Sequence, residues 1–413
     1  MPSERLYGKQ TRLSLDNTNV SGKRLADMPV FLAAYAHVKA AAAYANRDLG
    51  ALHSEIANAI VHAAQEVSAG QHNDQFPTSL VQGGGGTSTN MNLNEVLASR
   101  ATALLAGSGD RQLLVHPNDH VNRSQSTNDT YPTAMRLALH NSAQVAIAEL
   151  DRLVTTLHAL GTQYVGVSRL GRTCLQDAIT LTIEDTHKAQ ASGVERVRAD
   201  LAASLRTLQV VPLGATVLGS GLGTPHGYQA AAIAYLSELT GLDLVSPDNL
   251  YDALANADGY VMVAHALGRI MIVVGKLASD LRLLASGPHG GIGELSLPAL
   301  QAGSSMMPGK VNPIIPELVM QLGYRVRGAV HTVELAASAG EFEVNVMGPV
   351  ILDGLMNCIT DVTEATRALT DKCLTGAVWN IDVVSDHAAR SLESLVAVAA
   401  ENGYDVAAGR MRT

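Results

Sequence analysis

The sequence contains few aromatic residues and few charged residues. Aromatic residues make up 4% and charged residues 16% of its 413 positions, whereas hydrophobic residues make up 47%. Sheets favour aromatic and β-branched residues, while alanine and leucine, which supply most of the apolar positions here, favour helices. The composition therefore predicts a folded, mostly helical protein with a large buried core.

Cysteine is nearly absent, which excludes two common kinds of cross-linked fold. Cys174, Cys358 and Cys373 form no Cys-x-x-Cys pair and are odd in number. Neither a disulfide framework nor a zinc knuckle is predicted. A reducing cytoplasm is the expected compartment.

The sequence also lacks the segments that bind nucleic acids or membranes. The net charge is −9, and the sequence contains no cluster of lysine and arginine that could bind phosphates. A polyanionic partner is therefore not expected. The N-terminus is polar, and the apolar stretch at 261–277 is interrupted by His265, Arg269 and Lys276. Neither a signal peptide nor a membrane span is predicted.

Five stretches carry the periodicity of long helices. They are residues 134–165, 194–208, 253–285, 316–337 and 350–369. In the first, apolar residues recur at helical spacing at Leu150, Leu153 and Val154. The stretch 253–285 is apolar nearly all round and roughly 50 Å long at 1.5 Å per residue, so burial between subunits is expected. The segment before about Asn122 is expected to be a smaller mixed helical domain.

The segment 303–313, GSSMMPGKVNP, combines backbone freedom with hydroxyls, a cation and an amide. Its end leads into a helix that Asn312 could cap, with Pro313 at the first position and Glu317 in the first turn. Backbone donors, the helix dipole and Lys310 together would hold a carboxylate. The spacing does not fit a phosphate-binding loop, and a merely flexible connection is the alternative.

Other polar segments are ambiguous when taken singly. The hydroxyls of 124–129 either cap the following helix or bind a ligand, and the same holds for Thr87 and Ser88 after the glycine run at 83–86. His116 and His120 lie four apart, but Pro117 and the lack of a third ligand argue against a metal site. The glycines of 219–223 follow no predicted strand, which argues against a dinucleotide fingerprint.

Taken together, these segments resemble the aspartase/fumarase superfamily from about Leu6 to Asp405. GSSMMPGKVNP resembles its signature loop, and GTSTNMNLNEV, HPNDHVNRSQSTNDTYPTAM and GRTCLQDA match other blocks in the right order. The resemblance implies an all-α fold and a homotetramer, with a central bundle of long helices and active sites shared between subunits. It implies a helical N-terminal domain at 1–122, the bundle at 123–372, and a short C-terminal helical remnant at 373–413.

Within the superfamily, these motifs resemble those of aspartases more than those of fumarases. The triplet Gly86–Ser88 is aspartase-like, as are LGAT at 213–216 and Asn345-Val346-Met347. The resemblance implies removal of ammonia from L-aspartate to give fumarate, without a metal or organic cofactor. Ser304 would be the base that removes the proton, and Cys174 and Glu317 would be further catalytic residues. The residues expected to bind the small dicarboxylate are Thr87, Ser88, Ser126, Thr127, Asn128, Thr173, Lys310 and Asn312.

Cys174 departs from the superfamily pattern. Fumarases have histidine there, and many aspartases have glutamine or histidine, whereas a thiol accepts hydrogen bonds poorly. Slow hydration of fumarate is therefore expected, with space beside the amine for a larger nitrogen substituent. The alternatives are a lyase acting on an N-substituted or modified aspartate or succinate, a fumarate hydratase, or a catalytically silent binding protein. A buried Cys174 that only packs is the structural alternative.

Overall fold

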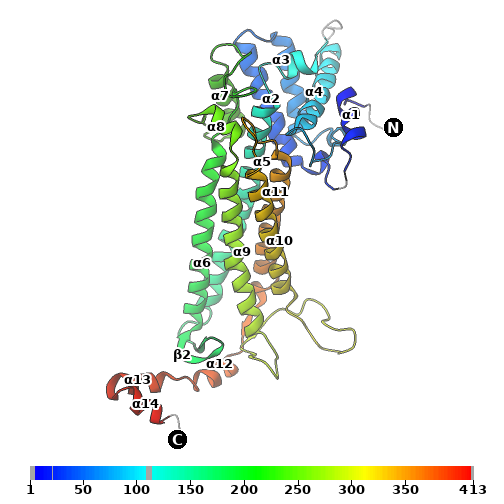
Figure 1. Ribbon diagram of the computed structural model, residues 1–413. Helices are drawn as coiled ribbons and strands as arrows, with labels where there is room; N and C mark the ends of the chain where they lie inside the picture. The colour runs from blue at the N-terminus through cyan, green and yellow to red at the C-terminus, as the bar shows by residue number, and fades with distance from the viewer. Residues whose placement is uncertain (1–4, 21, 108–113, 411–413) are drawn as a thin grey trace. The chain divides into compact units, whose positions relative to one another are not determined.

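The computed structural model describes residues 5–20, 22–107 and 114–410, and helices dominate it (Figure 1). The five long helices are α5 (Thr127–Thr162), α6 (Ile183–Ser204), α9 (Asp258–Leu284), α10 (Ile314–Ala337) and α11 (Gly348–Lys372). The shorter ones are α1 (Lys9–Asn17), α2 (Pro29–Asp48), α3 (Ser54–Ser68), α4 (Thr87–Gly107), α7 (Tyr228–Thr240), α8 (Leu250–Ala255), α12 (Ile381–Ala388), α13 (Glu393–Asn402) and α14 (Tyr404–Arg410). The predicted all-α class is confirmed.

The strands of the described residues form two small antiparallel pairs. One joins β1 (Ser168–Thr173) to β2 (Gln176–Thr182), and the other joins β3 (Leu295–Ser296) to β4 (Val378–Trp379). Single turns of 3₁₀ or π-helix complete the structure. These are η1 (Leu25–Asp27), η2 (Asn73–Gln75), η3 (Pro117–Val121), η4 (Leu205–Gln209) and η5 (Leu374–Gly376).

All five predicted long helices are present, but the one predicted at 253–285 is not continuous. The stretch 253–285 contains the end of α8 and the whole of α9, with a break between them. Asn256 has an extended backbone, with φ −107° and ψ 141°, and its side chain donates to Asp252. Asparagine readily leaves helical conformation because its side chain competes for backbone and neighbouring polar groups.

The described chain divides into two compact units. The first comprises Met1–Val145, Leu201–Ala266 and Arg327–Ile359, and the second comprises Ala146–Asp200, Leu267–Val326 and Thr360–Thr413. The boundaries fall inside long helices, so each unit contains parts of several of them. The three-part division predicted from chain order stays a prediction.

In the first unit, α2, α3, α4 and α7 pack around a core rich in alanine (Figure 1). The N-terminal helix α1 is held onto this core by a single carboxylate. Glu95 accepts hydrogen bonds from the backbone N–H groups of Gly8, Gln10 and Thr11 at 2.8–3.1 Å. A carboxylate at a helix N-terminus pairs with otherwise unpartnered donors and with the helix dipole.

In the second unit, the segments of α6, α9 and α10 run side by side (Figure 1). Small residues allow this closeness: a Cβ added to Gly193 would lie 3.2 Å from Val273, and one added to Gly323 would lie 3.5 Å from Met271. By length and composition α9 could cross a membrane, yet 50% of its most apolar window is buried inside the protein. Arg269 on this helix also pairs with Asp200 of α6 at 2.8 Å. We therefore describe α9 as a core helix.

The β1–β2 hairpin carries an unusual turn. Thr173 pairs with Gln176, so Cys174 and Leu175 form a two-residue loop, with φ values of 52° and 61°. Both central residues have the left-handed φ of a type I′ turn, which strongly favours Asn-Gly over residues with larger side chains. Neither cysteine nor leucine is suited to this conformation, so the turn is strained.

We expect Leu175→Gly to stabilise this hairpin by up to about 1 kcal/mol. Leu175 is 68% exposed, so its side chain contributes little packing, and glycine relieves the left-handed conformation. Amide hydrogen exchange within 168–182 should slow in this variant. Leu175→Ala, which keeps a Cβ, should not slow it, and equal exchange in the two variants would contradict strain at this position.

Candidate active site

The loop that carries Ser304 and Lys310 is closed at its base by hydrogen bonds. The backbone N–H of Gly303 donates to the carbonyl of Lys310 at 2.8 Å, and the Asn312 side-chain amide donates to the carbonyl of Gly303 at 3.0 Å. A Cβ on residue 303 would lie 2.8 Å from both the Asn312 nitrogen and the Lys310 oxygen, so glycine is required. The Asn312 NH₂ group thus closes this loop, and the capping of the next helix, which would use its Oδ1, stays a prediction.

Inside the loop, the hydroxyl of Ser304 meets two backbone donors. The N–H groups of Met306 and Met307 donate to its Oγ at 3.1 and 3.0 Å. Donors aimed at a hydroxyl oxygen stabilise its deprotonated form, because they favour negative charge there. Two such donors are a feature that a serine base would need, and the role of Ser304 as the base stays a prediction.

The second unit contains a cavity of about 710 Å³ beside this loop. Lys310, Asn312, Glu317 and Arg282 are among its lining residues, whereas Ser304 lines a second cavity of about 400 Å³, which Lys310 also lines. The guanidinium of Arg282 lies 3.5 Å from Glu317. A cavity of this size accommodates a small dicarboxylate, and its lysine can supply a charge-assisted hydrogen bond to a carboxylate.

The predicted residues Ser126 to Asn128 lie at the start of α5 in the first unit. The Ser126 oxygen accepts from the Asn128 backbone N–H at 3.2 Å, so the capping interpretation holds for this oxygen. The Asn128 amide donates to the Val217 carbonyl at 2.8 Å. Thr127 Oγ accepts from the Asn90 amide at 3.1 Å.

Asp129 ties this segment to the loop at 214–217. Its buried carboxylate accepts from the backbone N–H groups of Ser126 at 3.0 Å, Gly214 at 3.0 Å and Thr216 at 2.9 Å. The sequence analysis did not single out Asp129, although it lies inside the quoted segment 124–129. An acidic residue in the first turn of a helix is common, so nothing in the sequence indicated that Asp129 makes a long-range contact.

Thr87 and Ser88 open α4, which follows the glycine run. The Thr87 hydroxyl donates to the Gly84 carbonyl at 2.8 Å, and the Thr87 side chain is exposed. Gly86 has φ 94°, and a Cβ there would lie 2.2 Å from the Tyr131 ring. Glycine is therefore required at position 86, directly before α4, where the backbone packs against Tyr131 of α5.

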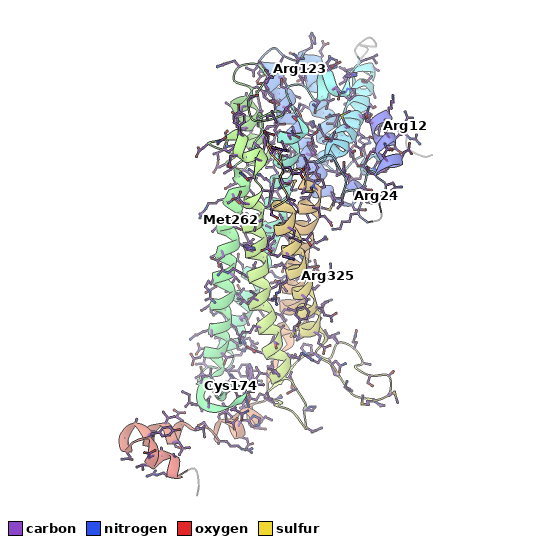
Figure 2. All side chains as sticks on the ribbon, viewed as in Figure 1. Arg12, Arg24, Arg123, Cys174, Met262 and Arg325 are labelled. Carbon is purple, nitrogen blue, oxygen red and sulfur yellow. The ribbon has the colours of Figure 1, made fainter. Side chains whose placement is uncertain are left out.

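Thr173 and Cys174 lie at the tip of the β1–β2 hairpin (Figure 2). Cys174 is exposed, whereas Cys358 and Cys373 are buried, so Cys174 is not packed inside its own chain. Directly before the tip, Arg172 donates to the fully buried Glu294 at 2.6 Å. This ion pair anchors the base of the strained turn.

Within the described residues, no group of three or more histidine, cysteine or acidic side chains could hold a metal ion. His116 and His120 instead hold a single π-helical turn. The Nδ1 atom of His116 accepts from the backbone N–H groups of Asn118 and Asp119, and Nδ1 of His120 accepts from the His116 N–H at 2.9 Å.

Comparison with known proteins identifies the family. The sequence model of the lyase family matches residues 1–328. The aspartate ammonia-lyase of Corynebacterium glutamicum is 39% identical, over 98% of this chain and 77% of that protein. The chain belongs to the aspartase/fumarase superfamily of lyases. A class II fumarate hydratase of Methylorubrum extorquens is 40% identical over 100% of this chain and 87% of that protein, so relatives with two different reactions are about equally similar.

Solved structures of the superfamily have the same fold. A fumarate lyase/delta crystallin from Brucella melitensis, in a cobalt-bound crystal, superposes with a TM-score of 0.94 at 38% identity. A class II fumarase from Schistosoma mansoni also gives 0.94, at 34% identity. Each match covers 99% of this chain and 89% of the other. The predicted aspartase/fumarase fold is confirmed.

The predicted site residues fall into two sets, one in each unit. The first unit holds Thr87, Ser88, Ser126, Thr127 and Asn128, and the second holds Thr173, Cys174, Ser304, Lys310, Asn312 and Glu317. In the first unit, Thr127 and Asn128 line a cavity of only about 40 Å³, which is too small for a dicarboxylate. The open cavity beside Lys310 is the larger binding space.

Proposed function

We propose that the protein is a carbon–nitrogen lyase that removes ammonia from L-aspartate to give fumarate. The observation that carries the proposal is the Ser304 oxygen, which two backbone N–H groups approach inside a loop that also presents Lys310. The similarity to aspartate ammonia-lyases supports the same reaction. The substrate class is a small four-carbon dicarboxylate.

In the proposed reaction, Ser304 Oγ, as the alkoxide, takes the proton from the carbon next to the β-carboxylate. The electron pair of the broken C–H bond is held on that carboxylate as an enediolate and then forms the double bond. The bond to the protonated amine breaks, and nitrogen keeps that electron pair and leaves as neutral ammonia. In an active site shared between subunits, Lys310 and Asn312 would bind the α-carboxylate, and Thr87, Ser126, Thr127 and Asn128 would bind the amine and the β-carboxylate. Thr173 would come from a neighbouring subunit.

The nature of residue 174 favours ammonia over water as the leaving group. An ammonium group leaves without receiving a further proton, whereas a hydroxyl group must be protonated as it leaves. The exposed thiol of Cys174 is a weak donor and a weak acceptor. Among the described residues, the ion-pair partner of Glu317 is the guanidinium of Arg282 and not a histidine.

The direct test is incubation of the purified protein with L-aspartate while the ultraviolet absorbance of fumarate is followed. A steady rise that depends on protein concentration is expected. A panel with L-malate and N-substituted aspartates separates the related reactions. Turnover of L-malate with none of L-aspartate would instead establish fumarate hydratase, the second candidate, which the 40% identical relative favours.

Lys310→Ala is expected to raise the Michaelis constant by about 10- to 100-fold, because it removes a charge-assisted hydrogen bond to a carboxylate. That contact exists in the ground state and the transition state alike, so kcat should fall less. The matched control is Lys276→Ala, which removes an exposed lysine that pairs with Asp280 on the same helix. An unchanged Michaelis constant in Lys310→Ala would refute the assignment.

Cys174→His is expected to raise the rate of fumarate hydration by at least about tenfold, because imidazole can act as a general acid or base near neutral pH. Release of ammonia from L-aspartate should fall as the larger ring occupies space beside the amine. Cys174→Ser, which leaves that space open, is the control. If neither rate nor substrate preference changes, Cys174 does not face the leaving group.

We also propose a homotetramer in the cytoplasm. In the second unit, α9 and α10 expose apolar side chains, among them Ile272 at 62%, Tyr324 at 63% and Leu318 at 41%. Such residues along core helices fit a surface covered by further copies of the chain. Cys174 and Cys373 are free thiols, which agrees with a reducing compartment. Sedimentation of a single species at four times the chain mass is expected, and a monomer would contradict the assembly.

A further inference from the structure

A buried lysine lies behind Thr127 in the first unit. Lys39 of α2 is fully buried, and its ammonium donates to Asn122 Oδ1 at 3.1 Å and to Gln125 Oε1 at 2.9 Å. It also lies 5.5 Å from the centre of the Tyr35 ring. Both hydrogen-bond acceptors are neutral amides. Burial lowers the pKa of Lys39 to about 7, although the charge of Asp129 opposes the shift. Burying a cation on such partners costs stability, so a role beyond packing is indicated.

The side-chain oxygen of Asn122 accepts hydrogen bonds from three side chains. Its Oδ1 accepts from Lys39 and from the amides of Asn90 and Asn94, each at 3.1 Å, while its own amide donates to the Gln125 carbonyl. A side-chain amide can bond in either of two orientations, whereas an ammonium group can only donate. Lys39 therefore requires that the Asn122 oxygen face it. Asn90 and Asn94 must then turn their NH₂ groups toward that oxygen.

The orientation of the Asn90 amide in turn determines the hydrogen bond to Thr127. The Asn90 NH₂ group also donates to Thr127 Oγ at 3.1 Å. Since the Thr127 oxygen is the acceptor here, its hydroxyl proton is left to donate to a ligand. The carbonyl oxygens of Asn90 and Asn94 are buried without a partner in the described part of the chain. Two unsatisfied acceptors make the orientation unfavourable for stability alone.

We propose that Lys39 is a positioning residue whose ammonium sets the direction of the Asn122–Asn90 amide chain, so that the Thr127 hydroxyl donates to a substrate carboxylate. The inference rests on the proposed function, because it takes Thr127 as a contact of the dicarboxylate. Without the ammonium, only the hydrogen bond from the Asn122 amide to the Gln125 carbonyl still opposes reversal of the amides. The Asn90 oxygen would then face Thr127, and the hydroxyl proton would point inward instead of toward the substrate.

The first test is Lys39→Met, which keeps the length of the side chain and removes every donor. The Michaelis constant, and the Kd for succinate as an unreactive dicarboxylate, should rise by at least about tenfold. Loss of folded protein would instead lower kcat at an unchanged Michaelis constant. Asn90→Asp is the second variant and removes the NH₂ group directly. It presents only oxygen to Thr127 and should give the same rise, whether or not Lys39→Met folds.

A double-mutant cycle separates this mechanism from a general structural effect. In a Thr127→Val background, which lacks the hydroxyl, Lys39→Met should change the Kd for succinate less than about twofold. In a Thr87→Val background it should keep its full effect, because the hydroxyl of Thr87 bonds to Gly84 instead. Glu95→Gln serves as the stability control and should lower the melting temperature without changing the Kd.

Equal effects of Lys39→Met in the Thr127→Val and Thr87→Val backgrounds would overturn the inference. So would an unchanged Kd in both Lys39→Met and Asn90→Asp. Neither result would affect the proposed function if the wild-type protein still converts L-aspartate. Wild-type protein that neither converts L-aspartate nor binds succinate would overturn the proposed function, and this inference with it.

Discussion

Ser304→Ala is expected to lower kcat for L-aspartate by at least about 1,000-fold, because it removes the group that accepts the substrate proton. The fold should be retained, since the change deletes one partly exposed hydroxyl and leaves the hydrogen bonds at Gly303 in place. The Michaelis constant should change little. Fumarate production under steady-state conditions measures the effect.

Ser305→Ala is the matched control, since it removes an exposed hydroxyl from the next residue of the same loop. Its kcat should remain within a few-fold of the wild-type value. If Ser304→Ala keeps the wild-type rate, Ser304 is not the base. If both variants lose activity equally, the loss reflects the loop conformation rather than proton transfer.

Asp129→Ala is expected to lower the free energy of unfolding by at least about 3 kcal/mol. The change leaves the backbone N–H groups of Gly214 and Thr216 buried without their acceptor, and each such group costs about 1–3 kcal/mol. The part-buried N–H group of Ser126 loses its acceptor as well. Asp129→Asn should lose less, because one oxygen can still accept from Gly214 and Thr216. Urea unfolding followed by circular dichroism measures both variants, and equal stability of all three proteins would contradict the account.

The same carboxylate should make stability depend on pH. Burial raises the pKa of Asp129 to about 6, although the three backbone N–H groups and Lys39 oppose the shift. An unfolded aspartate titrates near about 4. Because the folded pKa is the higher one, protonation favours the folded state, and this contribution is lost as the pH rises from about 4 to about 6. Asp129→Asn should lack that part of the pH dependence.

The sequence predicted the long helices well because their apolar residues repeat at helical spacing over many turns. It placed the Ser304 loop correctly between two such helices, since glycine, proline and hydroxyl residues interrupt the pattern. The break at Asn256 between α8 and α9 was missed, because the apolar periodicity continues across it. The β1–β2 hairpin was missed as well, because Cys174 and Leu175 are not turn-forming residues.

The residues that support the candidate site were harder to predict. Lys39 lies in the alanine-rich helix α2 and belongs to no motif, so only its position among apolar neighbours marks it in the sequence. Its partner Asn122, and Asn90, which bonds to Asn122, lie 83 and 51 positions further along the chain. Such contacts depend on helix packing. Local sequence patterns carry no information about distances of that kind.

The central claim is that nitrogen, and not oxygen, leaves from the four-carbon skeleton, and the reverse reaction tests it in a single sample. Fumarate is incubated with the protein and ¹⁵N-labelled ammonium in water, and the products are quantified by nuclear magnetic resonance. The account predicts labelled aspartate as the main product, with malate forming at least about tenfold more slowly because Cys174 is a weak proton donor and acceptor. Malate as the main product would contradict it.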